Sequence, residues 1–291
     1  PVRAYAVVRD GPVAGTDERA TLVKSPAAPR LSIVVLPFTN IGADPEQDYF
    51  VDGVTESLTT DLSRIAGSFV IARNTSFTYK AKSVKVQDVS RELQVTFVLE
   101  GSVRKAGARV RVTAQLINGK DEGHVWADRY DRDLTDIFAI QDEITHAIVE
   151  QLKVKLLPQE QQSIAQTPTD SIEAYTYYLR GRQFLHRHSK SYYQLARRMF
   201  AKAVELDPQY ARAYAGIADC DSFLCLHYYV DVGIDSILAA SARALELDDK
   251  LAEAHASRGL AFHLANRPDE AVAEFEQAIR LDVNSFEAHY F

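Results

Sequence analysis

Cysteine, methionine and tryptophan are almost missing from this sequence of 291 residues, which contains two, one and one of them. The two cysteines, Cys220 and Cys225, lie five residues apart in a segment with helical periodicity. Five residues turn a helix by about 500°, so the two thiols point to different faces and are badly placed to form a disulfide or to share a metal. We therefore expect two small buried side chains in a reducing compartment, and we predict a cytoplasmic protein.

Long apolar runs and a basic excess are also missing. The strongest apolar run, residues 33–36, is far shorter than the ~18 residues that a membrane helix needs. The first residues lack the charged start and apolar core of a secretory signal. The formal net charge is −7, and a phosphate backbone would demand a basic excess instead. We therefore expect neither a membrane nor a nucleic acid as a partner.

Motifs of catalysis and of nucleotide binding do not occur. Neither G-x-G-x-x-G nor G-x-x-x-x-G-K-[ST] is found, and no nucleophile is accompanied by a base. His186 and His188 resemble a pair of metal ligands only in residue type, because side chains two residues apart on a helix point about 200° apart. We expect no catalytic residue, no metal ligand and no cofactor in this chain.

The second half of the sequence contains an internal repeat. Residues 203–208, 244–249 and 278–283 place Ala, an aliphatic residue, Leu and Asp at the same offsets. Their aspartates, at positions 207, 248 and 282, are 41 and 34 residues apart. A period of about 34 residues is that of the tetratricopeptide repeat, which consists of two antiparallel helices. The longer interval indicates seven extra residues near 226–233.

Small and large residues fall where such helix pairs need them. Gly259 and Ala278 lie at positions where two helices approach closely, and Phe275 lies where the space between them is filled. Gly181 and Phe200 take the corresponding places in an earlier repeat. We predict about three repeats over residues 171–291, with the start of a fourth that continues beyond Phe291.

Residues 31–157 have a different pattern, in which short runs of β-branched residues alternate with segments of helical periodicity. Strands are predicted over residues 31–38, 69–72, 97–105, 109–117 and 124–130, and helices over 49–65, 86–93 and 134–157. This order favours a mixed sheet with helices packed on it. The predicted fold class is an α/β module followed by an all-α tetratricopeptide solenoid.

Two segments lack any apolar period. Residues 11–30 are rich in Pro, Ala and Gly, and residues 158–170 are rich in Gln. Both are predicted to be linkers, and we expect the chain to divide into separable modules at 158–170.

Five segments of the first module resemble a known family. Residues 32–38, 44–53, 71–74, 98–103 and 126–131 are together similar to the TolB-like amino-terminal α/β module. In bacteria this module commonly precedes tetratricopeptide repeats and follows a class III adenylate/guanylate cyclase domain or a DNA-binding regulator domain. Residues 1–8 also resemble the last strand of a class III cyclase domain, so residues 1–30 are expected to be the end of that domain and a linker.

The resemblance implies a non-catalytic, C-terminal regulatory or protein-interaction region of a class III cyclase, with a role in cyclic-nucleotide signalling. Mg²⁺ or Mn²⁺ is expected only in the upstream catalytic domain, and this chain is not expected to be an enzyme. The alternative is a small-molecule-sensing α/β domain, or a region of a DNA-binding transcriptional regulator, with the repeats as a scaffold.

The first candidate site is the concave face of the repeats, which the first helix of each pair lines. The alignment places Tyr178, Arg182, Asp219, Phe223 and His263 there. These residues combine aromatic area with charge, which suits an extended peptide or an acidic terminus. The alternatives are that these residues face only solvent, or that later repeats fill the groove. Self-association through the uncovered start of the fourth repeat is also expected.

The second candidate site lies where the first two strands end. Thr39, Asn40, Arg73 and Asn74 follow these strands, and open sheets bind ligands at the carboxyl ends of their strands. The alternative is that the Asn and Thr side chains satisfy backbone groups of the loops.

Overall fold

The computed structural model describes residues 31–283, 285, 288 and 289, apart from positions 43, 66, 155, 159, 160, 162, 163, 165 and 166. The expected end of an upstream domain in residues 1–30 lies outside the described residues. Parts of the predicted linker 158–170 and of the fourth repeat lie outside them as well.

The first module is a mixed sheet with helices packed on it. Its strands are β1 (Leu31–Val35), β2 (Thr39–Asn40), β3 (Ser68–Val70), β4 (Phe97–Ala106), β5 (Arg109–Asn118) and β6 (His124–Asp133). Its helices are α1 (Asp48–Ser63), α2 (Arg73–Ser76), α3 (Val86–Leu93) and α4 (Ile137–Gln151), with 3-10 turns at Pro45–Gln47, Phe77–Tyr79 and Leu134–Asp136.

The strands lie in the order β3-β1-β4-β5-β6, and β2 pairs with the second half of β4. β1 runs parallel to β3 and β4, whereas β4–β5 and β5–β6 are antiparallel. The apolar run of β1 is buried on both faces, as expected for a strand between parallel neighbours. The prediction of a mixed sheet is therefore confirmed.

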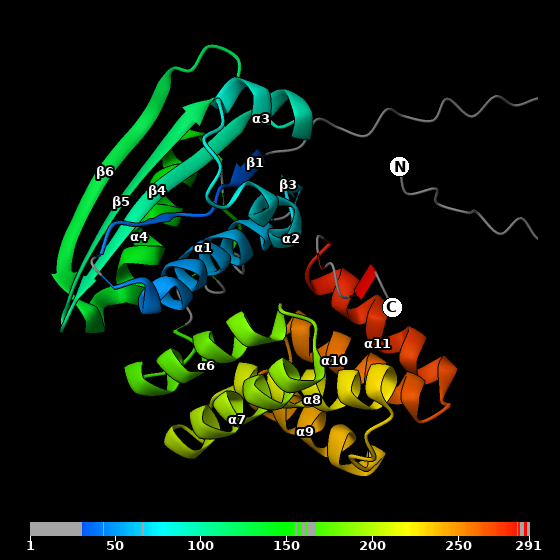
Figure 1. The fold of residues 1–291 in the computed structure, drawn as a ribbon. Helices are drawn as coiled ribbons and strands as arrows, with labels where there is room; N and C mark the ends of the chain where they lie inside the picture. Colours follow the sequence, from blue (N-terminus) through cyan, green and yellow to red (C-terminus); the bar gives the residue numbers. More distant parts are fainter. Residues whose placement is uncertain are drawn as a thin grey trace, which may run out of the picture.

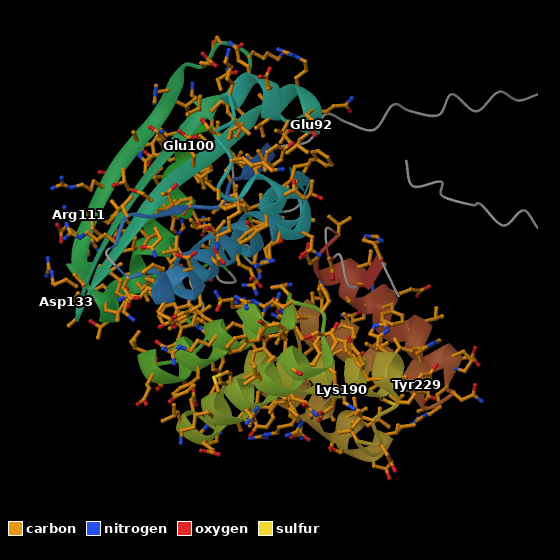
Figure 2. The ribbon with its side chains drawn as sticks, in the orientation of Figure 1. Glu92, Glu100, Arg111, Asp133, Lys190 and Tyr229 are labelled. Atoms are coloured by element: carbon orange, nitrogen blue, oxygen red, sulfur yellow. The ribbon has the colours of Figure 1, made fainter. Side chains whose placement is uncertain are left out.

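Helices α1 and α4 cover one face of the sheet, and α3 covers part of the other (Figure 1). The covered face of β5 contributes Val110 and Val112, both fully buried. Arg111 alternates with them and projects from the outer face, as does Glu100 of β4 (Figure 2). The part of this outer face that α3 leaves uncovered meets water, which an antiparallel part of a sheet tolerates.

The second module contains consecutive antiparallel helix pairs. They are α6 (Ile172–Leu185) with α7 (Lys190–Leu206), α8 (Ala211–Tyr228) with α9 (Ile234–Leu247), and α10 (Ala252–Leu264) with α11 (Pro268–Leu281). A Cβ atom on Gly259 would lie 2.6 Å from the ring of Phe275, so the glycine permits the close helix approach. The seven predicted extra residues correspond to the end of α8 and the connection to α9. The fold is thus an α/β module followed by helical repeats, as predicted.

The two modules share one hydrophobic core. One cluster of buried side chains includes residues of the sheet, of α1 and α4, and of α6, α7 and α8. The rings of Phe138 on α4 and Tyr175 on α6 lie 4.6 Å apart and pack edge to face. The two modules therefore pack against each other, and their separation at 158–170 stays a prediction. No helix in the described part of the chain is long and apolar enough to span a lipid bilayer.

Candidate functional site

Helix α1 lies between the sheet and the repeats, and it packs on the side of α6 that the repeat alignment assigns to the concave face (Figure 1). A Cβ atom on Gly53 would lie 2.4 Å from Leu179, so the two helices touch at this glycine. Nearby, the Ser57 and Tyr175 hydroxyl oxygens are within hydrogen-bond distance at 3.3 Å. We call this contact between α1 and the repeats the seam.

The seam continues beyond α6. The Ser63 hydroxyl at the end of α1 donates a hydrogen bond of 3.1 Å to Asp282, which follows α11. Burial raises the pKa of Asp61 on α1, although the positive charges of Arg64 and of Arg212 on α8 oppose this rise. Helix α1 therefore contacts the first helix pair and the residue that follows the last one.

A buried charge cluster lies at the centre of the seam. Glu56 of α1 contacts Arg73 Nε at 3.0 Å and Arg182 Nη2 at 2.5 Å, and His186 Nε2 lies 3.7 Å away. These four side chains are only 14–16 % exposed. Such charge-assisted contacts stabilise the seam because each guanidinium offsets the cost of burying the carboxylate.

The cluster has one dominant ionisation state near neutral pH. Burial would by itself raise the pKa of Glu56, but the charges of Arg182 and Arg73 outweigh burial and hold this pKa well below its usual range. Burial, together with repulsion from the two arginines, lowers the pKa of His186 to about 4. Glu56 is therefore ionised and His186 neutral at pH 7.

A cavity of about 90 Å³ lies beside this cluster, between the modules. Its lining is mostly polar and comes from α1, from the segment after β3, and from the repeats. The polar side chains include those of Thr59, Ser63, Arg73, Asn74, Arg182, His186, Glu253 and Asp282. The volume is enough for several water molecules or a small polar molecule.

Only half of the predicted ligand site is at this cavity. Arg73 and Asn74 line it, but Thr39 and Asn40 continue as β2 and pair with Ser102 and Val103 of β4. The four residues do not converge, and this prediction is wrong because the chain after β1 follows β4 away from β3. The amide of Asn40 donates to the backbone of Asp44 at 3.1 Å, which agrees with the alternative of a loop-stabilising side chain.

Two of the predicted groove residues are not open to a partner. Tyr178 is only 7 % exposed, and its ring packs 5.7 Å from Phe200 and 5.1 Å from Tyr210. Arg182 contacts Glu56 of α1. Their placement in an open groove is therefore corrected, since repeat alignment alone cannot detect a helix that arrives from the other module.

The other predicted groove residues lie on α8 and α10. Asp219 accepts a hydrogen bond of 2.6 Å from the Ser257 hydroxyl, which links α8 to α10. Phe223 is half-buried, with its ring 5.3 Å from that of Tyr193, and His263 is exposed. These three residues place a carboxylate, an aromatic ring and an imidazole on the first helices of the second and third pairs.

Sequence reasoning missed the seam residues Glu56, Leu179 and His186. One signal was present in α1, because Gly53, Glu56, Thr60 and Ser63 recur at helical spacing opposite its apolar residues. A stripe containing glycine on a helix that already has an apolar face indicates a second packing surface. The residue that this surface would contact could not be inferred in the same way.

A relative among known proteins matches most of this chain. No protein-family model matches the chain. Over 253 residues the chain is 43% identical to a protein of Rhizobium meliloti (strain 1021) named "Putative adenylate cyclase 3", and the match covers 84% of this chain and 42% of the relative. The chain thus spans less than half the length of that relative.

Solved structures resemble parts of the chain at low similarity. The tetratricopeptide domain of Arabidopsis OM64 is 20% identical with a TM-score of 0.34, and the match covers 40% of this chain and 89% of that domain. TolB from Acinetobacter baumannii is 17% identical with a TM-score of 0.33, and the match covers 45% of this chain and 29% of TolB.

Proposed function

We propose that this chain is a non-catalytic regulatory and protein-interaction region of a class III adenylate or guanylate cyclase. The observation that supports this most is the identity of 43% over 253 residues with a protein named as an adenylate cyclase. In this proposal the α/β module is TolB-like, and Mg²⁺ or Mn²⁺ belongs to a catalytic domain upstream. The parent protein acts in the cytoplasm, without a nucleic-acid or membrane partner.

The repeats are the partner-binding part of this region. Asp219, Phe223 and His263 combine charge with aromatic area, which suits a protein segment or peptide better than a flat apolar surface. The partner is a protein, and a second copy of this chain is included among the proposed partners.

The test uses the full-length parent protein and this chain alone. Cyclic AMP and cyclic GMP are measured with Mg²⁺ or Mn²⁺ for the parent, for the parent lacking residues 31–291, and for the chain by itself. We expect no cyclic nucleotide from the chain and cyclic nucleotide from both forms of the parent. The deletion should change the rate of cyclic-nucleotide formation or abolish its regulation. Product from the chain alone, or identical kinetics with and without residues 31–291, would contradict the proposal.

The inter-module cavity favours a second candidate, in which the α/β module senses a small polar molecule. Arg73 and Asn74 line this cavity together with Arg182 and Glu253 of the repeats. A compound that raises the melting temperature of the wild-type chain but not of Asn74→Ala would support this candidate. A screen of charged metabolites that finds no such compound would count against it.

A further inference from the structure

Helix α1 has two faces with different partners. Its apolar face, with Phe50, Val54, Leu58 and Leu62, is buried under the sheet. Its other face, with Gly53, Glu56 and Ser63, packs on the repeats. A helix laid in a groove formed by other helices is a common mode of recognition between two proteins. Here the same arrangement occurs within one chain.

The fit at the seam is close in shape. Any side chain larger than hydrogen at position 53 would collide with Leu179, whose Cδ atoms would be 2.4 Å and 2.6 Å from the new Cβ. The guanidinium carbon of Arg180 on α6 lies 4.9 Å from the centre of the Tyr49 ring on α1. The first helix of the repeats is therefore held against α1 at several points along its length.

The charges at the seam divide between the modules. Glu56 and Arg73 belong to the α/β module, whereas Arg182 and His186 belong to the repeats. If the seam opens, Glu56 keeps its contact with Arg73 while Arg182 leaves with the repeats. The opened repeats then present a guanidinium beside Leu179, where the carboxylate of another helix can bind as Glu56 does now.

We propose that α1 is an intramolecular occupant of the groove of the first repeat, and that an acidic helical segment of a partner binds there only when α1 is displaced. This inference rests on the proposed function, in which the repeats bind another protein. The partner segment has a small residue against Leu179 and, three positions later, a carboxylate that binds Arg182. Displacement is needed because two helices cannot occupy the same side of α6.

The test opens the seam by placing a larger side chain at position 53 and closes it again by placing a smaller one at position 179. The variants of the whole chain are Gly53→Leu, which collides with Leu179, and Gly53→Leu/Leu179→Ala, which restores the room. The probe is a labelled peptide that copies residues 47–65 with the four core-facing apolar residues replaced by alanine. Binding is measured by fluorescence anisotropy, and opening by hydrogen exchange of α6 amides.

We expect the Gly53→Leu variant to bind the peptide roughly tenfold more tightly than the wild type, or better. The reason is that a closed seam reduces the apparent affinity by the fraction of molecules that are open. The double variant should return to the wild-type affinity. A peptide with Gln in place of the residue that copies Glu56 should bind the opened variant about tenfold more weakly, because Arg182 loses its carboxylate partner.

Two controls separate opening from general damage. Gly259→Ala creates a similar collision, 2.6 Å from Phe275, inside the last helix pair and away from α1. This variant should not gain peptide binding, and a gain would overturn the inference. Glu56→Gln opens the seam by loss of charge instead of by volume, so it repeats the test if Gly53→Leu fails to fold.

The outcomes also distinguish the inference from the proposed function. If α6 amides exchange no faster in Gly53→Leu and Glu56→Gln than in the wild type, α1 is a fixed part of the core and the inference is overturned while the proposed function stands. If the seam opens and the peptide still does not bind, the concave face of α6 is not a peptide site. That result overturns the inference and leaves the proposed partner surface on α8 and α10 untouched.

Discussion

Asp142 on α4 is a carboxylate whose surroundings oppose its charge. Burial raises the pKa of Asp142 to about 6, and the negative charges of Asp61 and Glu143 add to the effect. The pKa of an aspartate in an unfolded chain is about 3.9. The folded state therefore binds the proton of Asp142 more tightly than the unfolded state does. Protonated Asp142 contributes its full stability below pH 4, and this contribution is lost as the pH rises through 6.

Asp142→Asn should stabilise the protein at neutral pH and not in acid. A pKa difference of about two units is worth ~2.7 kcal/mol, which we discount to about 1 kcal/mol because the carboxylate is partly exposed. The free energy of unfolding in urea at pH 7.5 should rise by this amount, and the gain should vanish near pH 4. Glu150→Gln, an exposed change on the same helix, should show no such pH-dependent gain. An equal gain at both pH values for Asp142→Asn would contradict this account.

Single residues also mark where prediction from sequence stopped. The repeat alignment places Tyr178 on the first helix of a pair, but the side chain is buried. Its burial depends on the rings of Phe200 and Tyr210, which fill the space beside it. A repeat pattern fixes the helix face of a residue but not the size of the neighbours that surround it.

At the scale of elements, Phe200 of α7 is the side chain that joins the first two helix pairs. Its ring lies between Gly181 of α6 and Gly216 of α8, where added Cβ atoms would be 2.5 Å and 2.8 Å from it. Phe200 is fully buried. The two glycines therefore shape the space that this ring fills.

Phe200→Ala should lower the free energy of unfolding by about 3–5 kcal/mol, because it leaves a cavity between three helices. Phe69→Ala is the matched control, since Phe69 is 43% exposed on an edge strand, and its cost should stay below about 1 kcal/mol. Gly216→Ala should cost less in the Phe200→Ala background than in the wild type, and urea titrations of the four proteins measure this coupling. Purely additive costs would show that the glycine and the ring do not share this space.

The regular elements were predictable because their periods are distinct. The helix over 86–93 has the predicted bounds, and β4 and β5 differ from the predicted strands by one residue each. The last helix of the first module was predicted to reach residue 157 but ends at Gln151, and Lys153 adopts a left-handed φ of 53° just after it. Apolar residues beyond this point kept the helical spacing, so the pattern gave no sign of the break.

At the scale of the whole molecule, the sequence indicated a boundary but not the contact across it. The Gln-rich stretch and the change of period predict two separable modules joined by a linker. The contact depends on Tyr175, which meets Phe138 of α4 at 4.6 Å and the amide of Gln141 at 3.3 Å. Aromatic residues at such repeat positions are equally consistent with a groove open to a partner, so only the fold reveals that the first module covers them.

The shared core predicts that the two modules unfold together, and the chain provides a separate probe for each. Trp126 is the only tryptophan and lies in β6, so its fluorescence reports the first module, whereas most of the helical circular dichroism comes from the repeats. In the wild type the two signals should change at the same urea concentration, because unfolding of one module exposes the core that it shares with the other. Tyr175→Ala removes the buried ring that joins α6 to α1 and α4, at a cost of about 3 kcal/mol or more, and should split the two midpoints. Tyr229→Ala, at a side chain that is 92% exposed, should leave them coincident. Separate midpoints already in the wild type would mean that the modules fold independently and that the seam contributes little to the stability of either one.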